Sequence, residues 1–158
     1  MNVGVLADTH IPRRARDLPA QAYQLLTGVD VIVHAGDVLE EPLLRRLAAI
    51  APLYAVQGNN DHALALPPTI ECTWEGLRVA VIHDAGPAQG RAARLRRRFP
   101  QANVVIFGHS HIPINVREAG VLLLNPGSPT DKRRQAHHTM ALLTLQAGSA
   151  SAEIVALD

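Results

Sequence analysis

The sequence has little of several things, and each shortage narrows the range of functions. Its one cysteine, Cys72, cannot form an internal disulfide, so nothing indicates an oxidising compartment. Aromatic residues make up only 3% of the chain and the formal net charge is +1, so we do not expect a nucleic-acid partner. No apolar run approaches the length that spans a membrane, so we expect no membrane partner either.

The remaining composition is ordinary for a globular protein. Hydrophobic residues make up 47% and charged residues 18% of 158 residues, which is enough chain to bury one core. We therefore expect a single domain over residues 1–158. No basic-then-apolar leader opens the chain, because strand-like residues begin at Val3, so we expect a soluble cytoplasmic location.

The first third of the chain alternates between strand and helix signals. Pro19 lies near a first helical position and Gly28 follows the last helical turn, while Glu40 and Glu41 place acids at the positive end of a second helix. The expected order is strand 3–6, helix 19–27, strand 29–33, helix 40–50 and strand 53–56. This βαβαβ pattern is typical of a parallel sheet with helical crossovers.

The second part of the chain reads mainly as hairpins. The expected order is strands 70–74 and 77–82 around Glu75-Gly76, helix 89–98, strand 103–107, strands 114–117 and 121–124, and strands 139–145 and 152–157 around residues 146–149. A parallel half followed by hairpins predicts an α/β (α+β) fold. In it, two mixed β-sheets pack face to face with helices outside.

Five polar fragments rich in Asp, Asn and His follow one another at the ends of the expected strands. They are Asp8-Thr9-His10, Gly36-Asp37, Gly58-Asn59-Asn60-Asp61, His83-Asp84 and Gly108-His109-Ser110-His111. Open α/β sheets bind ligands outside the carboxyl ends of their strands, so we expect one metal site there. In an extended backbone, residues two apart project to the same side, which would aim both members of each Asp or His pair at one ion. The glycines would let the chain turn sharply and approach the ion closely.

The candidate ligands combine carboxylate, amide oxygen and imidazole. They are Asp8, His10, Asp37, Asn59, His83, His109 and His111. Imidazole suits Mn, Fe, Zn or Co better than Ca or Mg. Seven ligands are too many for one such ion but suit two ions roughly 3.5–4 Å apart with a shared carboxylate. Two divalent ions outweigh two aspartates, so the site would attract a phosphate ester and lower the pKa of a bridging water into the hydroxide range.

Together these fragments resemble the calcineurin-like metallophosphoesterases over nearly the whole chain. With Asn125-Pro126-Gly127-Ser128, they are most similar to the small YfcE-type phosphodiesterases, whose eukaryotic relative is the Vps29 retromer subunit. The resemblance implies a four-layer αββα sandwich with two divalent metal ions. Manganese is the first choice, with Fe, Zn, Ni or Co as alternatives.

The resemblance also implies a role for each candidate residue. Four residues would hold the first ion: Asp8, His10, Asp37 and His111. Four would hold the second, with one shared between the ions: Asp37, Asn59, His83 and His109. Asp37, Asn59 and His109 would be catalytic, and Asn59 and Asn60 would bind the substrate. The implied substrate is a small-molecule phosphate diester, or an aryl or activated monoester, hydrolysed by a metal-bridging hydroxide.

Two positions depart from the family pattern. Asn60 stands where many members have a histidine that protonates the leaving group, and an amide cannot act as a general acid. We therefore expect good leaving groups, and diesters over monoesters, with His62 as a nearby residue of open role. Asp84 stands where relatives commonly have glycine, and it either perturbs the second metal or faces solvent.

Several alternatives stay open at this stage. A non-catalytic protein-binding scaffold like Vps29 would use the same fold, although a scaffold has no need of all seven ligands. A serine hydrolase at Ser110 would need glycine where Ile112 stands. We expect His34 to be a buried supporting residue and the arginines at 91, 94, 96, 97 and 98 to form a solvated helix face. A homo-oligomer is also open.

Overall fold

The computed structural model describes all residues from 1 to 158 and contains two five-stranded sheets and three helices. The first part of the chain forms β1 (Asn2–Leu6), α1 (Ala20–Leu26), β2 (Val31–His34), α2 (Glu41–Ala48) and β3 (Leu53–Ala55). The second part forms β4 (Thr69–Trp74), β5 (Leu77–Ile82), α3 (Arg91–Arg98), β6 (Val104–Ile106), β7 (Ile114–Glu118), β8 (Val121–Asn125), β9 (Thr139–Gln146) and β10 (Ser149–Ala156). Every helix and strand expected from the sequence is present.

Both sheets are mixed, as predicted. The first sheet has the strand order β10-β9-β1-β2-β3, with β1, β2 and β3 parallel and the β9–β10 hairpin added antiparallel to β1. The second sheet has the order β4-β5-β6-β8-β7, with β5, β6 and β8 parallel. Each sheet therefore has three parallel strands whose carboxyl ends share one edge.

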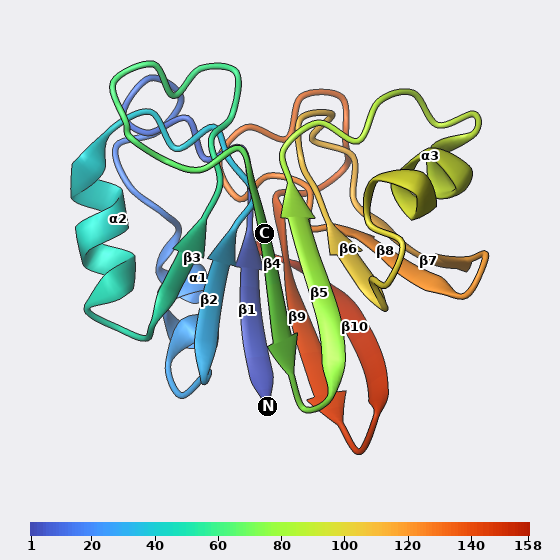
Figure 1. Cartoon of the computed structure of the whole chain (residues 1–158). Helices are drawn as coiled ribbons and strands as arrows, with labels where there is room; N and C mark the ends of the chain where they lie inside the picture. Colours follow the sequence, from blue (N-terminus) through green and yellow to red (C-terminus); the bar gives the residue numbers. More distant parts are fainter.

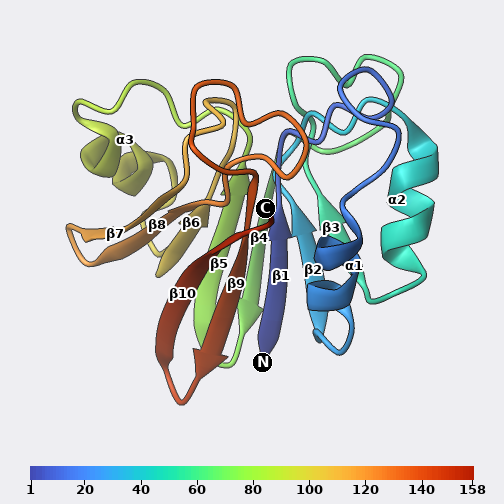
Figure 2. The same ribbon diagram turned by 180° about the vertical axis from the view of Figure 1, so that it is seen from behind.

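The sheets pack face to face, with helices on their outer faces (Figures 1 and 2). Alternation along the strands explains the layers, because successive side chains of a strand point to opposite faces. Val3 and Val5 of β1 belong to the core between the sheets, whereas Leu6 packs with α1 and α2. Leu95 of α3 packs on the outer face of the second sheet. The predicted four-layer αββα sandwich is confirmed.

The turn between β9 and β10 is shorter than the sequence indicated. The strand expected at 152–157 begins at Ser149, so the turn consists of Ala147 and Gly148 alone. Both have positive φ, 51° and 75°, which is the two-residue turn that matches the twist of paired strands. The polar residue Ser149, which the sequence placed in the turn, instead pairs with Gln146.

The loops that follow the parallel strands gather at one end of the molecule, at the top of Figure 1. Those after β1, β2 and β3 come from the first sheet, and those after β5, β6 and β8 come from the second. The polar fragments of the sequence all lie in these loops. None of the three helices is long and apolar enough to cross a membrane.

Candidate metal centre

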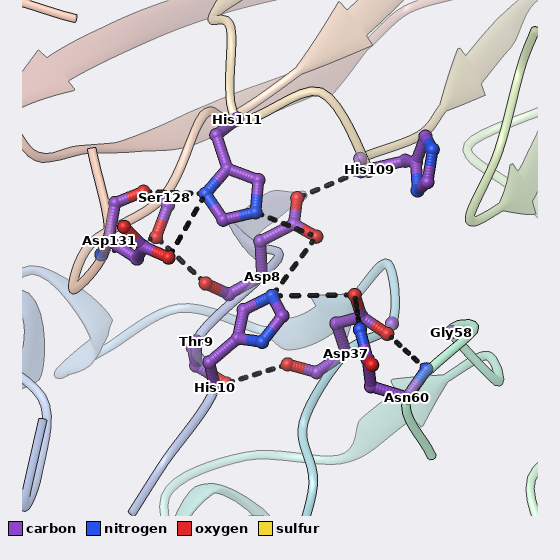
Figure 3. A network of polar contacts seen from close by, with 12 residues as sticks. Asp8, Thr9, His10, Asp37, Gly58, Asn60, His109, His111, Ser128 and Asp131 are labelled. Atoms are coloured by element: carbon purple, nitrogen blue, oxygen red, sulfur yellow. Dashed lines mark hydrogen bonds and ion pairs between the residues drawn. The ribbon is translucent and has the colours of Figure 1, made fainter. Parts of the chain in front are cut away.

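A first group of candidate ligands joins the loop after β1 to the loop after β6. Asp8 Oδ1 lies 3.9 Å from His10 Nε2 and 3.6 Å from His111 Nε2, and all three residues are buried. The two imidazole rings have centroids 5.2 Å apart. Figure 3 shows both rings turned toward the Asp8 carboxylate. These three atoms lie close enough together to bind one ion.

A second group shares Asp8 and adds residues from the loops after β2, β3 and β5. His83 Nε2 lies 3.9 Å from Asp8 Oδ1 and 3.5 Å from Asp37 Oδ2. Asn59 Oδ1 lies 3.0 Å from His83 Nε2 and 3.2 Å from His109 Nδ1. The structure thus brings all seven candidate ligands into one region.

Two carboxylates lie between the groups. Asp37 Oδ2 is 3.4 Å from His10 Nε2 and 3.5 Å from His83 Nε2, so it reaches both sides. Asp8 Oδ1 also reaches both sides, at the longer distance of 3.9 Å from each of these rings. The geometry therefore offers a carboxylate that two ions could share.

The donor set fits a bound cation. Asp8 Oδ1, His10 Nε2 and His111 Nε2 are all buried, and none has a hydrogen-bond partner in the protein. A buried polar atom without a partner costs about 1–3 kcal/mol, so such atoms are rare unless something else binds them. Carboxylate oxygen and imidazole nitrogen together favour a transition-metal ion or zinc.

Backbone carbonyls orient two of the imidazoles. His83 Nδ1 lies 2.7 Å from the Ala35 carbonyl, and His111 Nδ1 lies 2.5 Å from the Asp131 carbonyl. A carbonyl only accepts hydrogen bonds, so each Nδ1 carries the proton. The unpartnered Nε2 of His111 therefore presents its lone pair to the centre, whereas His83 Nε2 faces the acceptors Asn59 Oδ1 and Asp37 Oδ2. This second hydrogen bond fixes the tautomer that metal binding needs.

Burial and hydrogen bonding shift the pKa values of the cluster in different directions. Burial raises the pKa of Asp8 to about 7 and lowers the pKa of both His10 and His111. Burial alone would also raise the pKa of Asp37, but hydrogen bonds from His83 and Asn60 outweigh it and hold the pKa well below its ordinary value. Neutral imidazoles beside an ionised carboxylate are the protonation states of metal ligands.

The backbone at the centre is not extended, and that part of the sequence argument is wrong. The φ angles of five candidate ligands are positive: Asp8 (55°), His10 (46°), Asp37 (59°), His109 (73°) and His111 (62°). Side chains two apart converge here because both residues adopt left-handed conformations. Such conformations cost of order 1–3 kcal/mol each and concentrate at functional sites.

The glycines let loops of the protein approach one another closely beside the candidate ligands. A Cβ at Gly58 would lie 2.2 Å from both the amide nitrogen and Oδ1 of Asp37, and one at Gly108 would lie 2.9 Å from Asp8 Oδ2. Of the glycines at 36, 58 and 108, only Gly36 has a positive φ, of 100°. The loops can therefore cross closely only where no side chain intervenes.

Asp61 is a supporting residue whose role the sequence did not reveal. Its buried carboxylate accepts hydrogen bonds of 2.8 Å from the amides of Asp37, Leu39 and Gly58. It joins the loop after β2 to the loop after β3. The motif Gly58-Asn59-x-Asp61 was the available signal, but its acceptor role depends on backbone amides that no sequence pattern displays.

Ser128 supports the centre from the second sheet. Its hydroxyl donates to the Asp8 carbonyl at 2.8 Å and accepts from the Asp131 amide at 2.8 Å (Figure 3). Asn125 donates to the Gly108 carbonyl at 3.0 Å. The segment 125–128 therefore lies beside the centre, as the resemblance implied.

Asn60, His109 and Asp84 lie around the second group, and each makes different contacts. Asn60 donates its backbone amide and its side-chain amide to the two oxygens of Asp37, each at 2.9 Å. His109 is exposed, as is Asn59, and His109 Nε2 lies 3.8 Å from Asp84 Oδ2. Asp84 itself is exposed and accepts the Gly86 amide at 2.8 Å, so it caps its own loop.

The remaining expectations have mixed outcomes. His34 is fully buried and lies 3.0 Å from the Thr9 hydroxyl, as expected of a supporting residue, and burial lowers its pKa to about 3. Ser110 bonds only to Ile112 and Asn125, with no histidine to activate it.

The predicted solvated arginine face is wrong for Arg91 and Arg94, which are half-buried, whereas Arg96 is exposed. Arg91, Arg94 and Arg96 donate to carbonyls of neighbouring loops, because the residues before α3 and the turn at Ala119 lie within their reach. Arg97 and Arg98 are exposed and make no such bond.

The fold and the centre define a class: an αββα sandwich that gathers Asp, Asn and His at its strand ends to bind divalent cations. The sequence profile of the calcineurin-like phosphoesterase superfamily domain matches residues 1–148, and the chain belongs to that superfamily. A probable metallophosphoesterase of Methanothermobacter thermautotrophicus is 37% identical over 137 residues, which cover 84% of this chain and 80% of the relative. One of Methanocaldococcus jannaschii is 38% identical over 136 residues, covering 84% and 70%.

Solved structures agree with the fold. Vps29 of Entamoeba histolytica, solved in complex with Zn²⁺, matches with a TM-score of 0.81 at 21% identity and covers 100% of both chains. Vps29 of Cryptosporidium parvum matches with a TM-score of 0.82 at 20% identity, covering 98% of this chain and 96% of the other. At these identities the likeness shows the fold alone.

Proposed function

We propose that this protein is a phosphoesterase that uses two divalent metal ions and prefers phosphate diesters. The observation that carries the proposal is the convergence of three buried, unpartnered atoms: Asp8 Oδ1, His10 Nε2 and His111 Nε2. The neighbouring group of Asp37 and His83 shares Asp8 and supplies a second position. The curated relatives, described as probable metallophosphoesterases, support the same reaction class.

Each ion would have its own set of residues, with Asp37 shared. Asp8, His10, Asp37 and His111 would hold the first ion, and Asp37, Asn59, His83 and His109 would hold the second. Manganese is our first choice, although the zinc bound by the Vps29 of Entamoeba histolytica keeps zinc as an alternative. When bound, the ions supply positive charge for the phosphate oxygens and acidify a water to serve as the nucleophile.

The chain's own residues favour substrates with good leaving groups. Asn60 holds both oxygens of Asp37, which keeps this carboxylate oriented and ionised. As an amide, Asn60 cannot protonate a leaving alkoxide. An aryl oxide or another weakly basic leaving group departs without that proton, and a diester presents less negative charge than a monoester.

A metal-dependence assay tests the proposal. Bis(p-nitrophenyl) phosphate and p-nitrophenyl phosphate are compared with Mn²⁺ and with a chelator, and we expect faster Mn²⁺-dependent turnover of the diester. Asp37→Ala should reduce turnover about a thousandfold or more, because the shared ligand is lost. Asp30→Ala is the matched control, since Asp30 is an exposed aspartate next to the amino end of β2.

Three results would contradict parts of this proposal. Full activity in Asp37→Ala would exclude the two-metal arrangement. Efficient hydrolysis of an alkyl phosphomonoester that persists in His62→Ala would exclude the dependence on a good leaving group. A calorimetric titration that detects no Mn²⁺ binding would instead favour a protein-binding scaffold.

A further inference from the structure

A cavity of about 410 Å³ opens directly beside the second group of the metal centre. Asn59 and His83 form part of its wall, so a phosphate held at the centre would have one ester oxygen facing this space. The lining also includes His62 and Arg98. The volume exceeds what a phosphate group needs, so the cavity has room for part of the substrate beyond the phosphorus.

The cavity is polar, and two basic side chains of its lining make no hydrogen bond and no ion pair with the protein. They are Arg98, the last residue of α3, and His62. Asp84 is the one carboxylate in the lining, and its Oδ1 already accepts the Gly86 amide. The neighbouring Arg94, in contrast, donates hydrogen bonds to the carbonyls of Ala85 and Pro87.

The side chains of the lining also exclude some occupants. Ile82 and Pro68 are the only apolar side chains, and no Phe, Tyr or Trp lines the cavity, so a large apolar group would find little contact there. Gln57 and Thr69 offer an amide and a hydroxyl to a hydroxylated group. The Arg98 guanidinium lies 5.7 Å from the Phe99 ring centroid but donates no hydrogen bond, so it suits a phosphate or carboxylate, which it can bind through two parallel hydrogen bonds.

We propose that this cavity takes the alcohol half of the substrate and that Arg98 binds a second anionic group on it. The natural substrate would then be a phosphate ester of a polar alcohol that carries a further phosphate or carboxylate. This inference rests on the proposed phosphoesterase function and adds the substrate class to it. Arg98 is a specificity residue in this arrangement, because it lines the cavity and is not one of the candidate metal ligands.

Competitive inhibition tests the role of Arg98. The Mn²⁺-loaded full chain hydrolyses bis(p-nitrophenyl) phosphate in the presence of alkyl monophosphates or of α,ω-alkanediol bisphosphates of three to six carbons, at one fixed free Mn²⁺ concentration. One phosphate occupies the centre, and in a bisphosphate of suitable length the other reaches Arg98. For at least one length we expect the bisphosphate to inhibit about tenfold more strongly than the matched monophosphate.

Two neighbouring arginines give a matched comparison. Arg98→Gln should reduce the ratio of inhibition constants to about two, the statistical advantage of two equivalent phosphates. Arg97→Gln should keep both the ratio and the turnover, because Arg97 is exposed at the same helix end but does not line the cavity. A ratio near two in the wild type, or a ratio that survives Arg98→Gln, overturns the inference.

Failure of the proposed function gives a different result. Absence of Mn²⁺-dependent diester turnover in the wild type would contradict the phosphoesterase proposal itself. In that case calorimetric titration of the Mn²⁺-loaded protein with the same mono- and bisphosphates measures the ratio directly. Equal affinities of the wild type and Arg98→Gln for the bisphosphate would then overturn the role of Arg98.

Discussion

Gly58 shows how little space separates the residues of the metal centre. It lies in the loop after β3, and a Cβ there would come within 2.2 Å of two atoms of Asp37, one of them backbone. We predict that Gly58→Ala displaces Asp37, lowers the free energy of unfolding by about 1–3 kcal/mol and weakens Mn²⁺ binding at least tenfold. Chemical denaturation in chelator and calorimetric Mn²⁺ titration measure the two effects.

Gly148→Ala is a control for Gly58→Ala, because it introduces backbone strain without a steric conflict. Gly148 has a φ of 75° and open space around its Cβ position, in a hairpin turn whose two strands belong to the first sheet. Its substitution should lower stability by about 1 kcal/mol through strain and leave Mn²⁺ affinity unchanged. Wild-type Mn²⁺ affinity in Gly58→Ala would show that the contact with Asp37 does not position the ligand.

At the residue scale the sequence identified the candidate ligands but not the reason for their convergence. Asp, Asn and His at strand ends are visible as residue types, so Asp8, His83 and the others could be named. The left-handed backbone of these residues could not be predicted, because a positive φ is expected of glycine and is uncommon in other residues. The role of Asp61 stayed hidden for a related reason, since all three of its partners are backbone amides.

Two arginines of α3, Arg91 and Arg94, bond this helix to the loop after β5. Arg94 of α3 donates to the carbonyls of Ala85 at 2.7 Å and Pro87 at 2.6 Å, in the loop that begins with His83. We predict that Arg94→Met loosens residues 84–90 and increases their amide hydrogen exchange about tenfold or more, while exchange in the first sheet is unchanged. Mass-spectrometric exchange on matched peptides measures this.

Arg97→Met is the control for Arg94, since Arg97 has no bond to these carbonyls. It makes the same replacement of a charged side chain by an uncharged one, but it should leave amide exchange in residues 84–90 at the wild-type rate. Equal exchange in the two variants would mean that the loop is held by its other contacts, such as the Asp84 carboxylate bonded to the Gly86 amide.

At the element scale, the sequence predicted helices and strands well where the hydrophobic pattern and the Gly or Pro residues at element ends agree. Strands and helices followed from short apolar runs such as that of β1 and from Gly and Pro at element ends, and the layers followed from their order. The start of β10 was placed three residues late, because Ser149 looks like a turn residue and is a strand residue only through pairing with Gln146. Arg91 and Arg94 of α3 were misread because their carbonyl partners lie in loops whose course the sequence does not display.

At the scale of the whole molecule, the metal centre joins the two sheets. Asp8, His10, Asp37 and Asn59 follow strands of the first sheet, whereas the histidines at 83, 109 and 111 follow strands of the second. In the metal-free protein this junction holds buried polar atoms without partners. Ions that bind only the folded chain would remove that cost and add their binding free energy to the stability of the whole sandwich.

The effect of a candidate metal ligand on the stability of the metal-free protein can be measured at Asp8. Its pKa is about 7 in the folded protein against an ordinary 3.8, so the folded state holds the proton more tightly than the unfolded state does. The favourable contribution of the protonated form is therefore present below about pH 4 and is lost as the pH rises through 7. We predict that metal-free Asp8→Asn equals the wild type at low pH and becomes up to roughly 4 kcal/mol more stable by pH 8.

Mn²⁺ should reverse that order. At pH 8 the wild type gains stability with rising Mn²⁺, whereas Asp8→Asn, which lacks a charged ligand shared by both groups, gains far less. Urea denaturation at pH 5, 6.5 and 8, in chelator and in Mn²⁺, measures both effects, and the titrations of His10 and His111 largely cancel because both proteins contain them. A gap between the metal-free proteins that stays constant with pH would contradict the buried, weakly acidic Asp8. A Mn²⁺ response of equal size in both would contradict its role as a ligand.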